Sequence, residues 1–341
     1  MRIQTMDGLR VVGLGIVGLA GVLVVSAGCE RVGQALDRAR PAPAAAPSPV
    51  QLDPVETAVA PDARGTEPAV LSSLAGWDAA SAPEKEAAAR YVDAQTPWMT
   101  FVGLETFSCG GQTHEIALFE HTKAGLGFSL LPAGTFEMGS KSSESGRSAD
   151  EERHRVTLTR PFLICRTEVT QDGWNAIRSK NPSEFSGGQN PVETVTMIDV
   201  GRFLSRAKLS LPSEAQWEYA CRAGTKKAYS YGGEPSNLGD YAWYESNSAG
   251  TTHPVARKKP NAFGLYDMHG NVLEWCRDGY HAGDGMAATD PVGAKASDVV
   301  VRGGSWQNLP TVHRAAFRLR THPGDKHGGI GFRPIKELRA P

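Results

Sequence analysis

The sequence predicts an α+β fold with little regular secondary structure, placed behind an N-terminal segment that does not belong to it. Glycine is abundant, at 38 of 341 residues, whereas helical periodicity is confined to a few short segments. Beyond residue 228 the pattern indicates short strands separated by glycine-containing turns. Hydrophobic residues (40%) and charged residues (21%) occur at the levels of an ordinary soluble domain.

The overall charge gives no reason to expect a nucleic-acid partner. The formal net charge is −1 at pH 7, whereas nucleic-acid-binding domains normally carry a clear excess of lysine and arginine. We therefore expect no nucleic acid. Any membrane contact should come from a specific anchor, since the charge balance does not favour an anionic membrane surface.

The first 29 residues have the layout of a signal peptide or a lipoprotein anchor. Arg2 and Arg10 flank a basic start, and the apolar stretch over 11–28 is close to the lower length limit for crossing a bilayer. Small residues then precede Cys29, which resembles the lipidation motif of bacterial lipoproteins, although Ser26 stands where that motif prefers leucine. Lipidation of Cys29, an uncleaved anchor and simple secretion are the alternatives. The first two place an exported protein on a membrane of the bacterial envelope, in the periplasm or at the cell surface.

Three further segments follow. Residues 30–75 are rich in alanine and proline and poor in large apolar residues, so we expect a disordered linker. Residues 76–127 should form a short helix-and-strand extension, in which Ser81 and Glu84 make a capping box for a helix over about 82–94. Residues 128–337 should form the main domain.

Local patterns predict the elements of this region. Segments rich in β-forming residues are expected as strands over 114–120, 128–131 and 135–138. Two more helices are expected over about 197–208 and 214–222. Thr196 and Ser213 are the N-caps, with Asp199 and Gln216 three residues later, and Gly224 ends the second helix.

Seven motifs occur in order along the main domain. They are 131–140 (LPAGTFEMGS), 167–171 (TEVTQ), 190–193 (NPVE), 211–222 (LPSEAQWEYACR), 260–275 (PNAFGLYDMHGNVLEW), 302–306 (RGGSW) and 331–333 (GFR). In this order they closely resemble the formylglycine-generating enzyme, or sulfatase-modifying-factor, family over about 128–335. Any one motif is a weak signal, whereas the ordered set is very specific.

The resemblance implies a C-type-lectin-like fold, which is α+β with few regular elements and a core built by aromatic side chains. Trp217, Trp275 and Trp306 suit that role, because loop carbonyls can accept hydrogen bonds from their indole N–H groups. Glycines such as Gly264 and Gly304 would allow the tight loops between them.

Active members of the family oxidise a cysteine of a client sulfatase to formylglycine. The resemblance implies that they use molecular oxygen and a copper ion held by two cysteines soon after the Gly-Gly-Ser motif, a thiolate pair that suits Cu(I). Here no cysteine follows Ser305, and Asn308 stands about where the first thiol would be. His313 alone, among arginines, would make a poor copper site. We therefore expect neither copper nor catalytic residues, and we expect a protein that is not an enzyme.

The resemblance also implies one calcium site. Matched residue by residue, its ligands would be the Asp267 carboxylate, the backbone carbonyls of Gly270 and Val272, and the Glu274 carboxylate. Hard oxygen ligands on a tight glycine loop suit Ca²⁺. The alternative is that both carboxylates only cap N–H groups of the loop. Calcium is the expected cofactor.

Residues near the C-terminal end are expected either to line a groove or to form salt bridges. Active family members bind an extended client peptide in a groove, whose candidates here are Ser305, Trp306, Asn308, His313, Arg314 and Arg318. The alternative is that Arg314, Arg318, Arg320 and Arg333 pair with acids such as Glu168 or Glu218. A groove would suit a protein or peptide partner, or a glycan.

Four cysteines lie beyond the linker: Cys109, Cys165, Cys221 and Cys276. An even number in an exported chain predicts disulfides, with three possible connectivities. The resemblance adds that the counterpart of Cys221 is disulfide-bonded in some active members, but its usual partner position, near Ala315, is not a cysteine here.

Three functions remain in competition. The expected one is an envelope-tethered, catalytically degenerate binding or scaffold module that calcium stabilises. The alternative is a protein-modifying oxidase of the formylglycine-generating type with an altered site. A structural lipoprotein in a larger envelope assembly is the third. The missing thiols argue against the oxidase.

Overall fold

The computed structural model describes residues 66–338 with the exception of residue 284. The expected signal or anchor, Cys29 and most of the predicted linker lie outside these residues. Within the described part of the chain, none of the helices is both long and apolar enough to cross a membrane.

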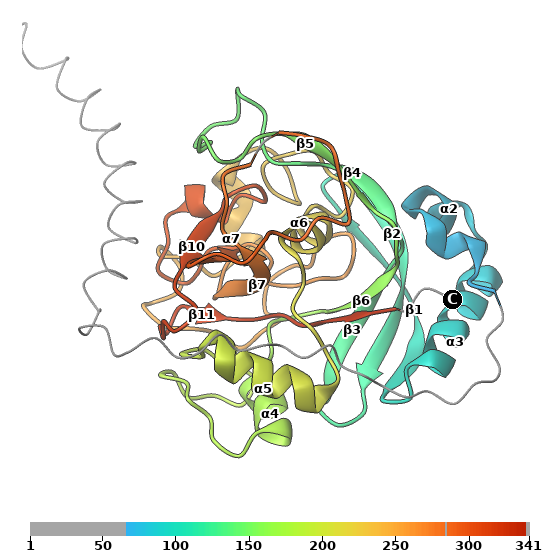
Figure 1. The fold of residues 1–341 in the computed structure, drawn as a ribbon, viewed down its shortest axis with the longest axis horizontal. Coiled ribbons are helices and arrows are strands. Elements are labelled where there is room, and N and C mark those ends of the chain that lie inside the picture. The colour runs from blue at the N-terminus through green and yellow to red at the C-terminus, as the bar shows by residue number, and fades with distance from the viewer. Residues whose placement is uncertain (1–65, 284, 339–341) are drawn as a thin grey trace, which may run out of the picture. The chain divides into compact units, whose positions relative to one another are not determined.

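A five-stranded antiparallel sheet runs in the order β1-β2-β3-β6-β12, and most of its strands are visible in Figure 1. Their bounds are β1 (Met99–Cys109), β2 (Gln112–His121), β3 (Leu126–Leu131), β6 (Phe162–Cys165) and β12 (Ile335–Glu337). The strands expected over 114–120 and 128–131 are thus confirmed as parts of β2 and β3. Because β1 and β2 come from the predicted extension, the extension and the main domain share this sheet.

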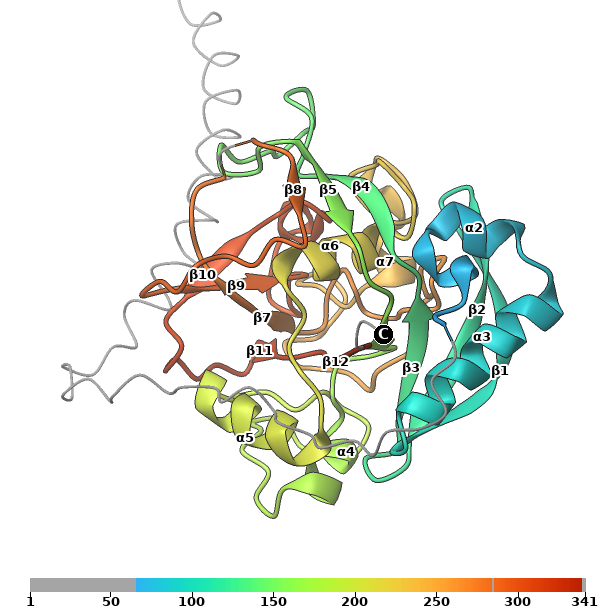
Figure 2. The ribbon, with the colours of Figure 1, turned by 45° about the vertical axis from the view of Figure 1, so that its right-hand side comes forward.

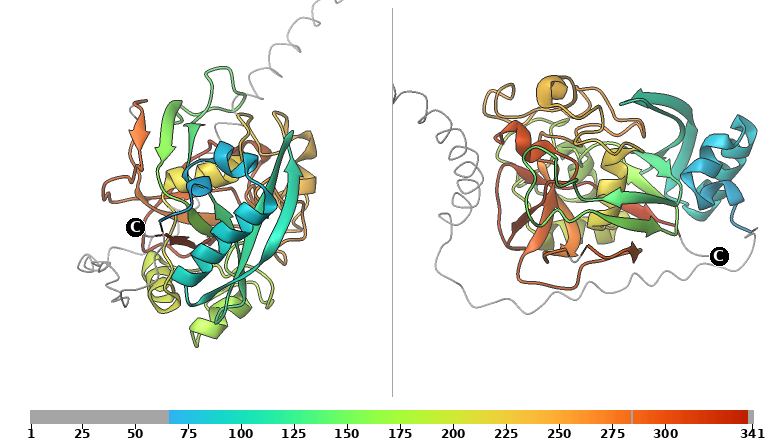
Figure 3. Two further views of the ribbon diagram at one scale, coloured as in Figure 1. Left: turned by 90° about the vertical axis from the view of Figure 1, so that its right-hand side faces the viewer. Right: turned by 90° about the horizontal axis from the view of Figure 1, so that it is seen from above.

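Three helices precede the sheet: η1 (Ala69–Ser72), α2 (Leu74–Ala79) and α3 (Ala82–Gln95). Helix α3 starts at the predicted capping box of Ser81 and Glu84 and packs on β1 and β2 (Figure 3). η1 and the start of α2 fall inside the range expected to be linker. Leu71 is buried inside that range, and Trp77, just beyond it, is buried as well and donates its indole N–H to the carbonyl of Glu115 at 2.7 Å. Ordered structure therefore begins earlier than the average composition indicated.

The other strands of the described residues form two smaller sheets (Figure 2). One contains β4 (Gly134–Met138), β5 (His154–Leu158) and β8 (Ala288–Thr289), and β4 confirms the strand expected over 135–138. The other runs in the order β10 (Leu319–Thr321), β9 (Val299–Arg302), β7 (Leu273–Gly279) and β11 (Ile330–Gly331). Within these two sheets, β5 with β8 and β7 with β11 are parallel pairs.

Both helices predicted from capping boxes in the main domain are confirmed, as α5 (Met197–Ala207) and α6 (Glu214–Arg222). All nine residues of α6 are buried, and Figure 1 shows this helix in the middle of the fold. Helix α4 (Gln171–Ile177) was not expected. The remaining short elements are η2 (Pro235–Asn237), α7 (Leu238–Tyr241) and η3 (Pro310–His313).

Aromatic side chains pack around α6, as the α+β fold with an aromatic core requires. The Tyr219 ring lies 5.5 Å from that of Phe136 and 5.6 Å from that of Phe263, both tilted. The buried Trp275 donates its indole N–H to the carbonyl of Val195 at 3.1 Å. Each aromatic ring pair, such as the two made by Tyr219, adds roughly 0.5–1.5 kcal/mol to stability beyond the burial of its apolar area. The core thus fixes the direction in which α6 presents its polar side chains.

Candidate functional site

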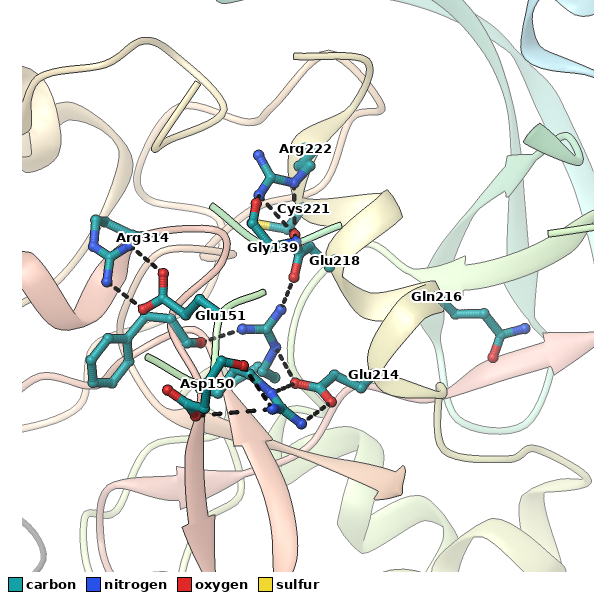
Figure 4. A network of polar contacts seen from close by, with 12 residues as sticks. Gly139, Asp150, Glu151, Glu214, Gln216, Glu218, Cys221, Arg222 and Arg314 are labelled. Atoms are coloured by element: carbon teal, nitrogen blue, oxygen red, sulfur yellow. Dashed lines mark hydrogen bonds and ion pairs between the residues drawn. The ribbon is translucent and has the colours of Figure 1, made fainter. Parts of the chain in front are cut away.

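Helix α6 places two carboxylates in a network of guanidinium groups (Figure 4). Glu218 accepts hydrogen bonds from Arg222 Nε and from the backbone N–H of Gly139, both at 2.8 Å, and its other oxygen pairs with Arg302. Burial alone would raise the pKa of Glu218, but Arg222 and Arg302 outweigh it and hold the pKa below its usual value. Glu218 is therefore charged and serves to fix two buried arginines.

Two of the arginines expected near a groove or in salt bridges belong to the same region. Arg314 donates to both oxygens of Glu151, at 2.8 Å through Nη1 and 2.6 Å through Nη2. Arg318 donates to both oxygens of Glu214, at 2.6 Å through Nε and 2.8 Å through Nη2. The salt-bridge alternative is thereby confirmed for these two residues, although with acids other than the two named from the sequence.

The six residues proposed for a groove differ in their access to solvent. The side chains of Ser305, Asn308, His313 and Arg314 are buried, whereas Trp306 and Arg318 are partly exposed. Asn308 Oδ1 accepts from both the backbone N–H and the hydroxyl of Ser305, at 2.8 Å each. A Cβ at Gly304, where φ is +76°, would overlap the His313 ring. The Gly-Gly-Ser segment is therefore a tightly packed turn, and of the six proposed groove residues only Trp306 and Arg318 are open to a ligand.

An open cleft of about 270 Å³ lies beside the α6 network. Glu152, Glu214 and Asp278 contribute carboxylates to its lining, and burial raises the pKa of Asp278 to about 6. Met286 and Val292 also line the cleft and are 69% and 51% exposed, which is unusual for large apolar side chains in this protein. The cleft thus combines acidic walls with an apolar rim. Sequence reasoning missed it, because its residues come from segments far apart in the chain.

The four cysteines of the described residues are free, buried thiols, which corrects the expectation of disulfides. Each lies in a different element: Cys109 on β1, Cys165 on β6, Cys221 on α6 and Cys276 on β7. Burial raises the pKa of Cys165 to about 11 and those of the others above their usual value. None lies after the Gly-Gly-Ser motif. The copper ion of active family members therefore does not fit the residues present.

Asp267 and Glu274, the two carboxylates expected to hold calcium, differ in what they already bind. Asp267 is 2% exposed, and its Oδ2 accepts the backbone N–H of Ala256 at 2.8 Å, while Oδ1 has no hydrogen-bond partner. Glu274 accepts from Arg333 Nη2 at 2.7 Å, from Arg333 Nε at 3.0 Å and from Trp217 Nε1 at 2.7 Å. Asp267 thus fits a cation, whereas Glu274 is already neutralised by a guanidinium group.

The loop that joins these carboxylates is tightly turned. Asp267 and Asn271 have φ values of 59° and 66°, and a Cβ at Gly270 would lie 2.3 Å from the carbonyl oxygen of Trp243. Three of the four expected ligand residues, Asp267, Gly270 and Val272, lie in this loop. The fourth, Glu274, lies at the start of β7. No three acidic, histidine or cysteine side chains of the described residues are arranged to hold a metal ion. Carbonyl oxygens or water would have to complete a calcium site.

Glu168 was expected only as a salt-bridge acid. Its side chain is fully buried, and neither carboxylate oxygen has a hydrogen-bond partner. Burial, and after it the charge of Asp267, raises the pKa of Glu168 well above its usual value. The signal in the sequence was a glutamate three residues after the apolar run that forms β6 and next to Val169, where a buried, unpaired charge is rare.

The comparisons with known proteins agree on a family. A family model described as the sulfatase-modifying factor enzyme 1-like domain matches residues 117–338. The chain is 28% identical to chaperone protein LppX of Paenibacillus barcinonensis over 267 residues, which are 62% of this chain and 87% of that protein. It is 33% identical to the formylglycine-generating enzyme of Streptomyces coelicolor over 44% of this chain, and it spans 54% of that enzyme.

The solved structure of PvdO from Pseudomonas aeruginosa is similar as well. It is 31% identical, with a TM-score of 0.57, over 65% of this chain and 98% of PvdO. The family match begins inside β2 and extends to the end of the described residues. These similarities and the mixed helix-and-strand architecture confirm the expected C-type-lectin-like fold. The chain belongs to the sulfatase-modifying-factor family, the family of the formylglycine-generating enzymes.

Proposed function

We propose that the protein is a non-catalytic binding or scaffold module of the bacterial envelope, stabilised by calcium and holding a protein or peptide partner. One observation carries this proposal: Asn308 stands where active family members have a copper-binding thiol, and its side chain is used to hold Ser305. No cysteine follows Ser305 in the sequence. A serine without a thiolate pair cannot bind Cu(I) or activate oxygen through it.

The names of two relatives support different functions. LppX, described as a chaperone protein and aligned over most of its length, supports a role in holding another protein. The enzyme from Streptomyces coelicolor supports the alternative, an oxidase of the formylglycine-generating type. We favour the binding role because the four described thiols are buried and have raised pKa values, which disfavours the reactive thiolate.

The acidic cleft beside α6 is the proposed binding surface. Arg318 also lines the cleft and already pairs with Glu214, so Glu152 and Asp278 are the carboxylates that favour a positively charged side chain. The exposed Met286 and Val292 favour an apolar neighbour of that side chain. An extended peptide that carries a lysine or arginine next to an apolar residue provides both the positive charge and the apolar neighbour. A glycan offers no positive charge and is the weaker alternative partner.

Calcium and the anchor complete the proposal. The buried Asp267 Oδ1 without a partner supports a bound cation, because an orphaned carboxylate oxygen in the interior is costly. The apolar stretch over 11–28 and Cys29 support attachment to a membrane through lipid. A purely structural lipoprotein would share this anchor but would not need the cleft.

Replacing Val292 with lysine is expected to weaken binding of a basic, apolar peptide about tenfold or more, which corresponds to roughly 1.4 kcal/mol. The substitution removes an apolar contact and adds a repelling charge at the cleft. Val102 on β1 is 63% exposed and does not line the cleft, so Val102→Lys is the matched control and should bind like wild type.

The measurement is fluorescence polarisation with labelled peptide libraries and the full-length protein. Equal loss in both lysine variants would contradict the assignment of the cleft. A preference of wild type for acidic peptides, or for glycans on an array, would contradict the proposed partner class.

A further inference from the structure

Glu168 is an acid that the fold buries without an evident partner. It is 0% exposed and both of its carboxylate oxygens lack a hydrogen bond, and the same holds for Oδ1 of Asp267. By contrast, the equally buried Glu218 and Glu274 are each paired with arginine. A buried ionised carboxylate without a partner costs several kcal/mol. The interior at Glu168 therefore requires either a proton or a cation.

Backbone contacts bring the segments of Glu168 and Asp267 together. The N–H of Tyr266, the residue before Asp267, donates to the carbonyl of Arg166 at 2.8 Å. Arg333 then joins the same two segments, since it donates to the carbonyl of Cys165 at 2.9 Å and to that of Tyr266 at 2.8 Å. The Glu168 carboxylate and the Asp267 carboxylate, of which only Oδ2 has a partner, are thus held on adjoining stretches of chain around one guanidinium group.

The charges around Arg333 do not balance within the protein. Glu168, Asp267 and Glu274 contribute three negative charges when ionised. Arg333 contributes one buried positive charge, and the partly exposed Lys258 contributes a second one near Asp267, so negative charge is still in excess. Arg333 donates through Nε and Nη2 to Glu274, and Trp217 adds a third hydrogen bond to the same carboxylate. The uncompensated charge therefore lies on the other two carboxylates, where a bound cation would offset it.

We propose that the calcium ion of this protein is bound between Asp267 and Glu168, and that Glu168 replaces Glu274 as the second acidic ligand. This assignment rests on the proposed calcium-stabilised module and changes its ligand set. Two carboxylates with neighbouring carbonyl oxygens and water provide the hard oxygen ligands that Ca²⁺ requires. Glu274 instead anchors Arg333 and Trp217, so that the cation and the guanidinium group share three carboxylates.

The test compares three isosteric variants, Glu168→Gln, Asp267→Asn and Glu274→Gln, in the full-length protein purified in detergent. Melting temperature is measured in chelator and in excess Ca²⁺, and Ca²⁺ binding is measured directly by calorimetry. Wild type should melt higher in Ca²⁺, because the ion binds only the folded state. Glu168→Gln and Asp267→Asn should each lose this shift and the binding heat.

The variants should also differ in chelator. Glu168→Gln should melt no lower than wild type there, because without the cation Glu168 needs a proton, and the neutral amide takes the place of the protonated acid. Glu274→Gln should melt lower, because it weakens the pair with Arg333, yet it should keep the shift with Ca²⁺. A shift that survives in Glu168→Gln and disappears in Glu274→Gln would overturn the proposed ligand set.

One further outcome separates this inference from the wider proposal. If wild type shows neither a shift nor binding heat with Ca²⁺, the two carboxylates share a proton and the ligand assignment is wrong. Calcium stabilisation would then fail as well, while peptide binding at the cleft would still be decided by the Val292→Lys experiment.

Discussion

Replacing Glu218 with alanine is expected to lower the free energy of unfolding by about 3–5 kcal/mol, because it leaves Arg222 buried without a carboxylate and Arg302 with only the longer, 3.4 Å contact to Glu214. Arg302 is 0% and Arg222 4% exposed, so water cannot compensate either guanidinium group. The N–H of Gly139 loses its acceptor in the same step. Urea denaturation followed by tryptophan fluorescence measures the change.

The exposed pair of Glu86 and Arg90 is the matched control. Its side chains are 47% and 68% exposed and interact across one turn of α3. Such pairs contribute only about 0.3–0.5 kcal/mol, so Glu86→Ala should unfold almost like wild type. Similar losses in the two variants would contradict the view that the α6 network holds the fold together.

Replacing Cys29 with serine is expected to move the protein from the membrane fraction to the soluble fraction. The thiol is the proposed attachment point of the lipid, and stable anchoring requires more than one acyl chain. Lipidation of a bacterial lipoprotein supplies two or three chains at this cysteine. Metabolic labelling with a radioactive fatty acid, followed by fractionation, measures both effects.

Either of two outcomes would contradict lipid anchoring at Cys29. Wild type without lipid label would show that Cys29 is not a lipidation site. A Cys29→Ser variant that stays in the membrane at full length would instead favour an uncleaved segment over 11–28, which is close to the minimum length for a bilayer. A Ser26→Ala variant serves as the control, because it changes the same region without removing the thiol.

Local signals in the sequence predicted the elements whose structure depends on neighbouring residues. The capping boxes at Ser81, Thr196 and Ser213 each begin a helix, because their hydrogen bonds are made within a single turn. The seven-residue helix α4 was missed, although Thr170 caps it, since one short turn gives little periodicity. The helix η1 was missed because the average composition of residues 30–75 hides one buried anchoring residue, Leu71.

The site was less predictable, because its properties depend on contacts between distant segments. The motif over 260–275 indicated a tight glycine loop, and the chain turns tightly at Asp267 and Asn271, whereas Glu274 lies in β7. It could not show that Arg333 and Trp217, each more than fifty residues away, donate hydrogen bonds to the Glu274 carboxylate. Nor could the cysteine count show that the four thiols lie apart in the core. These facts follow from tertiary packing alone.

We expect the protein to lack formylglycine-generating activity, because no cysteine follows Ser305 to bind copper. The protein is co-expressed with a client sulfatase, and mass spectrometry determines the fraction of the client cysteine converted to the aldehyde. The enzyme of Streptomyces coelicolor, expressed in parallel, shows that the client is competent. Because no thiol follows Ser305, we expect conversion no higher than in cells without either protein, and aldehyde above that background would contradict the account.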